Sequence, residues 1–358
     1  MAFERKTRKH RTLTAIPKAV KHKIEMIPEN FPKPHFLPTL LDVVFCRMKY
    51  GSGVDDYFDF RFYSMNHIGR KSFGTVRDQF KLYYANDKDY IIRTANKNEF
   101  VKHYGHLMGR ETMSVSLETN EESFREFQEK AKAAGFQRII FKPYRGNSGR
   151  GVFILSLDDP DIQSVKTVMD RYNREIADVL QDVPQLKKGL VEQQELVAEW
   201  VIENHADVKK VHPSSLNTLR MPTLRSGENC KVMGGYLRFG RDGLSVDNIS
   251  SGGMVAEVDL DTGIVVSAAV DHAGREFYKH PTTGEIIIGL QVPYWEEAKA
   301  LALEAAKITP QLIYTGWDVA ITPTGPILIE GNSMGGLEIQ QMPRHMGKRY
   351  LYEKVLDK

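Results

Sequence analysis

The sequence predicts an α+β fold, because helical and strand-like segments are mixed along the chain and the strands are arranged as hairpins. Residues 318–322 and 327–330 are rich in β-branched and aliphatic side chains and flank a Pro-Thr-Gly turn, which is typical of a hairpin. Residues 138–143 and 152–156 are two further strand-like runs, joined by a glycine-rich loop. Residues 294–307 have the apolar spacing of a helix.

Length and composition narrow the class of protein. With 358 residues the chain has room for about two domains. Its 41% hydrophobic and 27% charged residues are typical of a globular protein, and a net charge of +3 predicts no nucleic-acid partner. No signal peptide and no apolar run of about 20 residues is present, so we expect no transmembrane segment and a cytoplasmic location. Cys46 and Cys230 indicate neither a disulfide framework nor a zinc site.

The N-terminal part begins with a basic segment. Its first 23 residues contain eight lysines and arginines but only one acid, Glu4. We interpret this segment as a solvated tail, with electrostatic contact to an acidic lipid or polymer as the alternative. A helix is expected from Thr39 to Gly51, and another over residues 95–104. The aromatic run 57–63 is expected to pack in a core.

The glycine-rich loop is a candidate phosphate-binding element. Asn120 is expected to cap a helix that ends at Gly135 and leads into strand 138–143. A strand follows the loop, whereas a P-loop or dinucleotide fingerprint needs a helix there. The loop would therefore close over phosphates with its own backbone amides. Its candidate residues are Gly146, Ser148, Gly149 and Gly151, and Lys142 precedes them.

The C-terminal hairpin predicts a metal site. If its turn is the three residues 323–325, equal steps outward bring Asp318 opposite Glu330. Because side chains alternate along a strand, Glu330 and Asn332 share one face. Two carboxylates and an amide oxygen are hard ligands that suit Mg²⁺ or Mn²⁺, with phosphate and water completing the shell.

The motifs and their order resemble the ATP-grasp superfamily. The run from Trp317 to Asn332 is similar to its sugar-transfer-associated branch, which is related to α-L-glutamate-ligase-like proteins. The resemblance covers about residues 90–345 and implies an ATP-grasp fold, in which two α+β subdomains clasp ATP. The expected divisions are a mostly helical or mixed N-terminal region (1–110), a lid subdomain (111–200) and a metal and acceptor subdomain (201–358).

The resemblance also implies roles for single residues. Lys97 and Lys142 match lysines that contact the nucleotide. A carboxylate and neighbouring backbone groups at a hinge bind the adenine edge; Glu199 matches that carboxylate, with Glu192 as the alternative. The remaining matches are the hinge residues Trp200 and Val201, the catalytic candidates Asn217, Arg220 and Arg238, and the acceptor-loop residues Asp247, Asn248, Gly252 and Gly253.

The arginines suit this interpretation for a physical reason. The resemblance places Arg220 and Arg238 on central strands, where a guanidinium is costly to bury unless an anion meets it. Its planar, permanently charged group suits a phosphate or a carboxylate. Structural ion pairing is the alternative at both positions.

The predicted activity is an ATP-dependent carboxylate–amine ligase with ATP and Mg²⁺ (or Mn²⁺) as cofactors. Its acid would be an amino acid, a peptide or a sugar acid, activated as an acyl phosphate that an amine attacks. The alternatives are a phosphotransferase acting on a small-molecule hydroxyl and a non-catalytic nucleotide-binding protein. The partners expected are small molecules, and the sequence leaves open whether the chain is a monomer or a homodimer.

Overall fold

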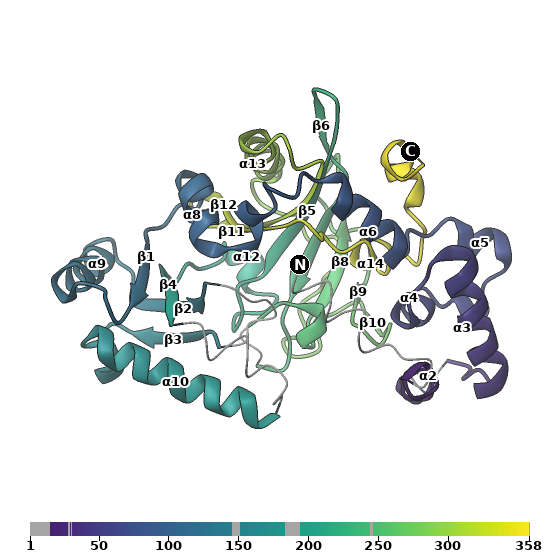
Figure 1. Cartoon of the computed structure of the whole chain (residues 1–358), viewed down its shortest axis with the longest axis horizontal. Coiled ribbons are helices and arrows are strands. Elements are labelled where there is room, and N and C mark those ends of the chain that lie inside the picture. Colours follow the sequence, from purple (N-terminus) through teal and green to yellow (C-terminus); the bar gives the residue numbers. More distant parts are fainter. Residues whose placement is uncertain are drawn as a thin grey trace.

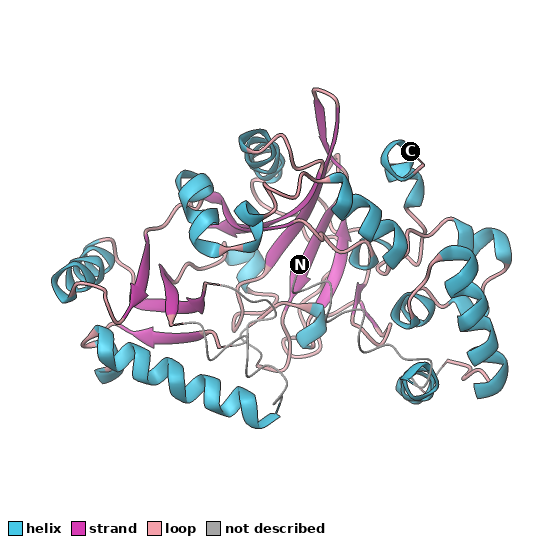
Figure 2. Cartoon of the chain, in the orientation of Figure 1, coloured by secondary structure: helices cyan, strands magenta, loops and turns pink. Residues whose placement is uncertain are grey.

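The computed structural model describes residues 15–27, 29, 31–144, 151–182, 194–243 and 246–357. These residues form an N-terminal group of helices, a small sheet with two helices beside it, and a large sheet (Figure 1). Figure 2 shows the two sheets separated along the long axis of the molecule, with the helices around them. The α+β fold predicted from the sequence is confirmed.

The small sheet has the antiparallel strand order β1-β4-β2-β3. Buried side chains alternate with more exposed ones along β2, and the buried ones pack with α9 and α10 in one core cluster. Asn120 caps α9 by accepting from the amides of Glu122 and Ser123, as the sequence predicts. The elements are β1 (Thr112–Ser116), α9 (Glu121–Ala133), β2 (Arg138–Pro143), β3 (Phe153–Ser156), α10 (Val165–Asp182) and β4 (Glu195–Trp200).

The large sheet has the order β10-β9-β8-β7-β5-β11-β12, with β6 paired to β5. Every residue of β7 and β11 is buried, because these central strands are covered on both faces. The helix α13 (Trp295–Ile308) packs its alanines into the same core as Trp317. The strands are β5 (Thr218–Ser226), β6 (Asn229–Val232), β7 (Gly235–Phe239), β8 (Met254–Val258), β9 (Ala269–Val270), β10 (Glu276–Phe277), β11 (Tyr314–Thr322) and β12 (Gly325–Asn332), and the short helices are α12 (Ala206–Lys209), α14 (Glu338–Gln341) and α15 (Glu353–Leu356).

The N-terminal group is helical. Its aromatic run packs in a core with Phe73, as the sequence predicts, although Tyr57 and Phe58 lie on a helix. The basic segment is not a tail throughout: residues from Ala15 form a helix, because Ile16 and Val20, four apart, bury one face. The helices are α2 (Ala15–Met26), α3 (Phe36–Tyr50), α4 (Val54–Asp59), α5 (His67–Lys71), α6 (Val76–Ala85), α7 (Ile92–Ala95) and α8 (Lys97–Tyr104). No described helix is long and apolar enough to cross a membrane.

The C-terminal hairpin contains the predicted pairing of Asp318 with Glu330, but its turn differs from the predicted one. Thr322 faces Gly325, so the turn has two residues and the predicted three-residue turn is wrong. Equal steps from this turn would bring Asp318 opposite Ile329. A β-bulge between Asp318 and Val319 in the ladder absorbs one extra residue and restores Asp318 opposite Glu330. Bulges of this kind re-aim side chains beside functional sites.

One side chain joins the N-terminal helices to the large sheet. Asn86, which follows α6, donates to the carbonyl of Tyr314 at 2.9 Å and accepts from its amide at 2.8 Å. Asn86 and Tyr314 are both buried, so this amide extends the hydrogen bonding of β11 into the helical group.

We expect Asn86→Ala to lower the free energy of unfolding by about 2–4 kcal/mol, because it leaves two buried backbone groups without partners. Urea unfolding followed by circular dichroism measures the change. Asn229→Ala, at an exposed position of β6, is the control and should stay within about 0.5 kcal/mol of the wild type. Equal stabilities of the two variants would contradict the assigned role.

Candidate active site

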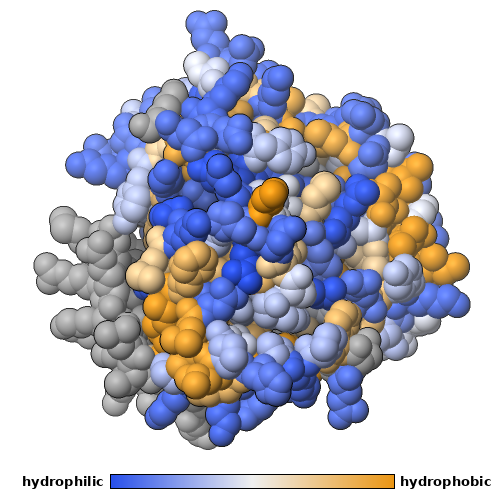
Figure 3. All heavy atoms as spheres, turned by 90° about the vertical axis from the view of Figure 1, so that its right-hand side faces the viewer, coloured by the Kyte–Doolittle hydropathy of each residue, from blue (hydrophilic) through white to orange (hydrophobic). Residues whose placement is uncertain are grey.

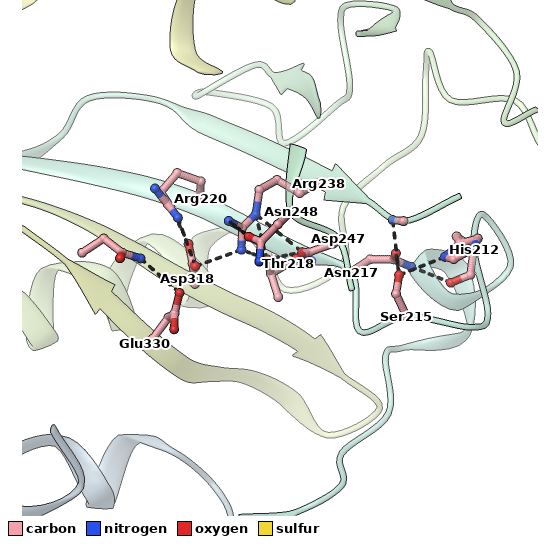
Figure 4. A network of polar contacts seen from close by, with 12 residues as sticks. His212, Ser215, Asn217, Thr218, Arg220, Arg238, Asp247, Asn248, Asp318 and Glu330 are labelled. Carbon is pink, nitrogen blue, oxygen red and sulfur yellow. Dashed lines mark hydrogen bonds and ion pairs between the residues drawn. The ribbon is translucent and has the colours of Figure 1, made fainter. Parts of the chain in front are cut away.

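Asp318 lies at the centre of the candidate site, on the middle strand β11. Arg220 on β5 donates to it from Nε at 2.5 Å and from a terminal nitrogen at 3.1 Å. Arg238 on β7 donates to the same carboxylate at 2.9 Å (Figure 4). All three side chains are buried. The ion pairing that the sequence left as the alternative for both arginines is therefore present.

Glu330 and Asn332 complete the predicted trio. Glu330 faces Asp318 across the hairpin and is exposed, and Asn332 donates to its carboxylate at 3.2 Å. Glu330 reaches solvent, but partial desolvation by neighbouring protein atoms and the negative charge of Asp318 raise its pKa. Burial acts to raise the pKa of Asp318 as well, but the charges of Arg220 and Arg238 outweigh it and lower that pKa. The two carboxylates thus differ in their affinity for a proton.

A second carboxylate holds Arg238 from the other side. Asp247 lies 3.5 Å from its Nε and accepts from the amide of Thr218 at 2.9 Å. Asn248 accepts from Arg238 at 3.3 Å. Asp247 and Asn248 therefore position Arg238, whereas the sequence predicted that they line an acceptor pocket. Their binding of an acceptor stays a prediction.

The glycines of this loop serve its own geometry. Gly252 has φ +99°, a left-handed conformation that favours glycine. A Cβ atom at Gly253 would clash with the carbonyl of Asp247. Both glycines are thus required for the turn that carries Asp247, and this explains them without the close ligand approach that the sequence predicted.

Asn217 is likewise occupied within its own loop. Its amide nitrogen donates to the carbonyl of His212 at 2.8 Å, and its oxygen accepts from Ser215 at 2.9 Å (Figure 4). Its backbone amide donates to Asn204, and all these groups are buried. Asn217 therefore positions the loop that enters β5. The hydrogen bonds of its side chain go to its own loop and not to Asp318 or the two arginines. Its role as a catalytic residue stays a prediction.

The small sheet contributes a second charge cluster. Glu199 on β4 accepts from Arg110 at 2.5 and 2.8 Å and from Lys142 on β2 at 2.8 Å. Burial acts to raise the pKa of Glu199, but the charges of Arg110 and Lys142 outweigh it and lower that pKa to about 2. Glu199 is therefore ionised and fixes the position of Lys142.

Lys97 links the two clusters. It is the first residue of α8, and its backbone amide donates to the carbonyl of Tyr144, just after β2. Burial and the nearby charge of Lys142 lower the pKa of Lys97, while Glu330 and Glu199 oppose that shift. The lysine thus lies within the field of both carboxylates, one from each sheet.

A cavity of about 240 Å³ lies between the sheets. Charged side chains from the small-sheet cluster line one part of it, and Ile329 of the bulge lines another. Among the described lining residues are Arg110, Ile140, Lys142, Ile154, Glu199, Trp200, Val201, Glu203 and Ser215. This cavity combines apolar walls with a few convergent charges, as small-molecule sites do.

The two predicted hinge residues, Trp200 and Val201, are held in place by the small sheet. The indole of Trp200 packs in the small-sheet core, with its ring centre 5.0 Å from that of Phe136. The amide of Val201 donates to the carbonyl of Arg138 at 3.0 Å.

Of the predicted glycine-rich loop, Gly151 has φ +70° and packs closely against Ile176 of α10. Four predicted residues lie outside the described part of the chain, namely Gly146, Ser148, Gly149 and Glu192.

Arg110 and Thr218 were missed by sequence reasoning. Arg110 follows the N-terminal helices directly, where no motif marks it, and a single arginine at a junction carries no signal. Thr218 is the first residue of β5, and its hydroxyl accepts from Arg238 at 3.1 Å. The contact follows from the register of β5 and β7, which pairs Thr218 with Arg238.

The chain belongs to the sugar-transfer-associated ATP-grasp family, whose family model matches residues 76–356. The fold and the sequence motifs agree with that membership. A comparison with curated protein sequences gives no match.

Solved structures with a similar arrangement include several ligases. D-alanyl-alanine synthetase A from Vibrio cholerae has a TM-score of 0.41 and 12% identity, covering 74% of this chain and 65% of its own. The D-alanine–D-alanine ligase from Coxiella burnetii has a TM-score of 0.41 and 10% identity, covering 74% and 57%. The Bacillus anthracis ligase has a TM-score of 0.39 and 15% identity, covering 77% of both chains. The match thus spans less than two thirds of the first two proteins, and the family match carries the assignment.

We expect Asp318→Asn to lower the free energy of unfolding by about 3–5 kcal/mol, because it leaves the buried Arg220 without a counter-charge and leaves Arg238 with Asp247 alone. Glu330→Gln, at the exposed position opposite, should change it by no more than about 0.5 kcal/mol. Urea unfolding of both variants measures the difference. Equal losses would show that Asp318 is not the charge on which the arginines depend.

The stability contributed by Glu199 should depend on pH. Its pKa is about 2 when folded, below its ordinary value of 4.5, so the contribution is complete above about pH 4.5 and is lost as pH falls toward 2. Relative to Glu199→Gln, the wild type should be about 3–5 kcal/mol more stable at pH 7 and less so at pH 3. Urea unfolding at the two pH values tests this, and a difference that grows toward acid would contradict it.

Proposed function

We propose that this chain is an ATP-dependent carboxylate–amine ligase that forms an amide through an acyl phosphate. One observation carries the proposal: Asp318 and Glu330 face each other on the large sheet, and Lys97 lies in the field of Glu330 and also of Glu199 and Lys142 on the small sheet. Negative and positive groups are thus set on opposite sides of one site. Membership in the ATP-grasp family supports the choice of ATP.

A divalent cation fits the carboxylate side of the site. Two carboxylates facing each other need a proton or a cation between them, as the raised pKa of Glu330 indicates. We propose that Asp318, Glu330 and Asn332 would hold Mg²⁺ or Mn²⁺. No group of three His, Cys, Asp or Glu side chains that could hold a metal occurs among the described residues. Phosphate oxygens would therefore have to supply ligands. When bound, such a cation offsets charge on phosphate oxygens.

The side chains have separable tasks in this proposal. Lys97 and Lys142 would bind the phosphates, with Lys142 held in place by Glu199. The cavity between the sheets would take the nucleoside. Because Arg220 and Arg238 are both bound to Asp318, they would act by fixing that carboxylate and by the field of their charges.

The chemistry would proceed in two steps. An oxygen of the substrate carboxylate attacks the γ-phosphorus of ATP, the bond to the bridging oxygen breaks, and ADP leaves. An amine then attacks the acyl carbon, and inorganic phosphate leaves with the bonding electrons while the amine loses a proton. An amino acid, a peptide or a sugar acid would each provide the carboxylate.

Hydroxylamine distinguishes this ligase from a phosphotransferase. The chain, incubated with MgATP, a candidate acid and hydroxylamine, should form ADP and a hydroxamate in equal amounts. A stable phosphorylated product without hydroxamate would identify a phosphotransferase. Nucleotide binding without ADP formation for any acid would identify a non-catalytic nucleotide-binding protein.

We expect Glu330→Gln to lower the rate of ADP formation at least about 100-fold, because it removes one of two carboxylates beside the phosphates. Coupled measurement of ADP release tests this. Glu297→Gln, at an exposed position of α13, is the matched control and should keep the wild-type rate. Unchanged activity in Glu330→Gln would overturn the assigned role of the carboxylate pair.

A further inference from the structure

The helix α3 is apolar on both sides. Val43, Cys46 and Tyr50 face the N-terminal core and are buried. The opposite side carries a stripe of four exposed apolar side chains, which we call the α3 stripe: Leu37 (63% exposed), Leu41 (66%), Phe45 (43%) and Met48 (73%). At 3.6 residues per turn they fall within an arc of about 80°. An apolar outer face is not needed for the fold, because the core lies on the other side.

Positive charge borders the α3 stripe. Arg47 and Lys49 are exposed and, by helical spacing, lie on either side of Met48. The acid of this helix, Asp42, accepts from Arg70 at 2.7 and 2.8 Å and from Tyr57 at 2.7 Å, so its charge is already paired. The exposed charge of α3 is thus basic.

An open groove of mixed charge lies next to the stripe. It has a volume of about 500 Å³, and its charged lining residues are Lys49, Lys71, Arg77 and Arg349 against the acids Asp78, Glu353 and Asp357. Arg349 is paired with Asp357 and Asp78, whereas Lys49, Lys71 and Arg77 make no ion pair with the described residues. Figure 3 views the molecule from the side of these helices and shows orange apolar patches among blue polar surface.

We propose that this face binds the surface of an anionic lipid bilayer. The α3 stripe would enter the boundary between headgroups and acyl chains, and Lys49, Lys71 and Arg77 would contact lipid phosphates.

A second copy of the chain is a poorer occupant. A symmetric contact centred on Met48 would bring Arg47 and Lys49 of both copies close to one axis, and like charges close together oppose association. A bilayer that contains anionic lipid meets the apolar stripe and the cations at once. The proposed surface contains no residue of the candidate active site, so its test does not depend on the proposed function.

Sedimentation of the full chain with vesicles tests the proposal. The wild type should bind vesicles of phosphatidylcholine with 30% phosphatidylglycerol at low salt and should bind pure phosphatidylcholine at least about tenfold more weakly. Leu41→Ser/Met48→Ser should weaken binding to the anionic vesicles about tenfold or more, because two exposed apolar side chains no longer insert. Lys49→Glu/Lys71→Glu should weaken it by a similar factor.

Matched controls use residues of equal exposure elsewhere. Leu117→Ser/Ile286→Ser replaces side chains that are 64% and 62% exposed on other faces, and Lys231→Glu/Lys307→Glu changes charge without touching the groove. Both should bind vesicles as the wild type does, and all variants should keep the wild-type melting temperature.

Three results would overturn the proposal. Absent vesicle binding together with dimerisation that Leu41→Ser/Met48→Ser abolishes would make the stripe an interface between copies. Vesicle binding that is unaffected by that variant would be adsorption through basic residues alone. Calorimetric binding of inorganic phosphate that is lost in Lys49→Glu/Lys71→Glu, without vesicle binding, would make the groove a site for a free anion.

Discussion

The arrangement of Arg220, Asp318 and Arg238 on three adjacent strands is the constraint on which the large sheet depends. A buried guanidinium without a counter-charge is costly, and here two of them share one carboxylate on the strand between β5 and β12. Asp247 then balances Arg238 from the loop before β8. The order and register of β7, β5 and β11, and the position of the loop that carries Asp247, therefore all depend on the charge of Asp318.

The two sheets present opposite excess charge to the space between them. On the large sheet, Glu330 is the carboxylate left exposed after the arginines are matched. On the small sheet, Glu199 is shared by Arg110 and Lys142, so a positive charge is left over. Lys97 of α8, which lies in the field of both Glu330 and Glu199, adds another positive charge. A polyphosphate with a bound cation is complementary to this distribution, whereas a neutral ligand would leave it unbalanced. Family membership and electrostatics thus favour the same ligand class.

Sequence reasoning predicted the strands and most residues of the site but not the contacts between those residues. The pairing of Asp318 with Glu330 was predicted from a three-residue turn and occurs through a two-residue turn and a bulge, because a bulge leaves no composition signal. Arg220 and Arg238 were placed on central strands correctly, yet their shared partner depends on a register that the chain order does not reveal. Asn217 and Gly253 were selected because they match motifs of the family, and in the structure each of them fixes a loop.

The outer faces of the helices differ in polarity, and packing explains the outer face of α9 but not that of α3. The outer face of α9 is charged and its inner face carries Phe124 and Phe127, so its sequence follows from burying one side. The outer face of α3 is as apolar as its inner face, although the inner face already supplies the contacts with α2 and α4. Folding of this chain does not account for that second face. Its apolar side chains and bordering cations match a surface that is apolar inside and anionic outside, which is the property of a bilayer.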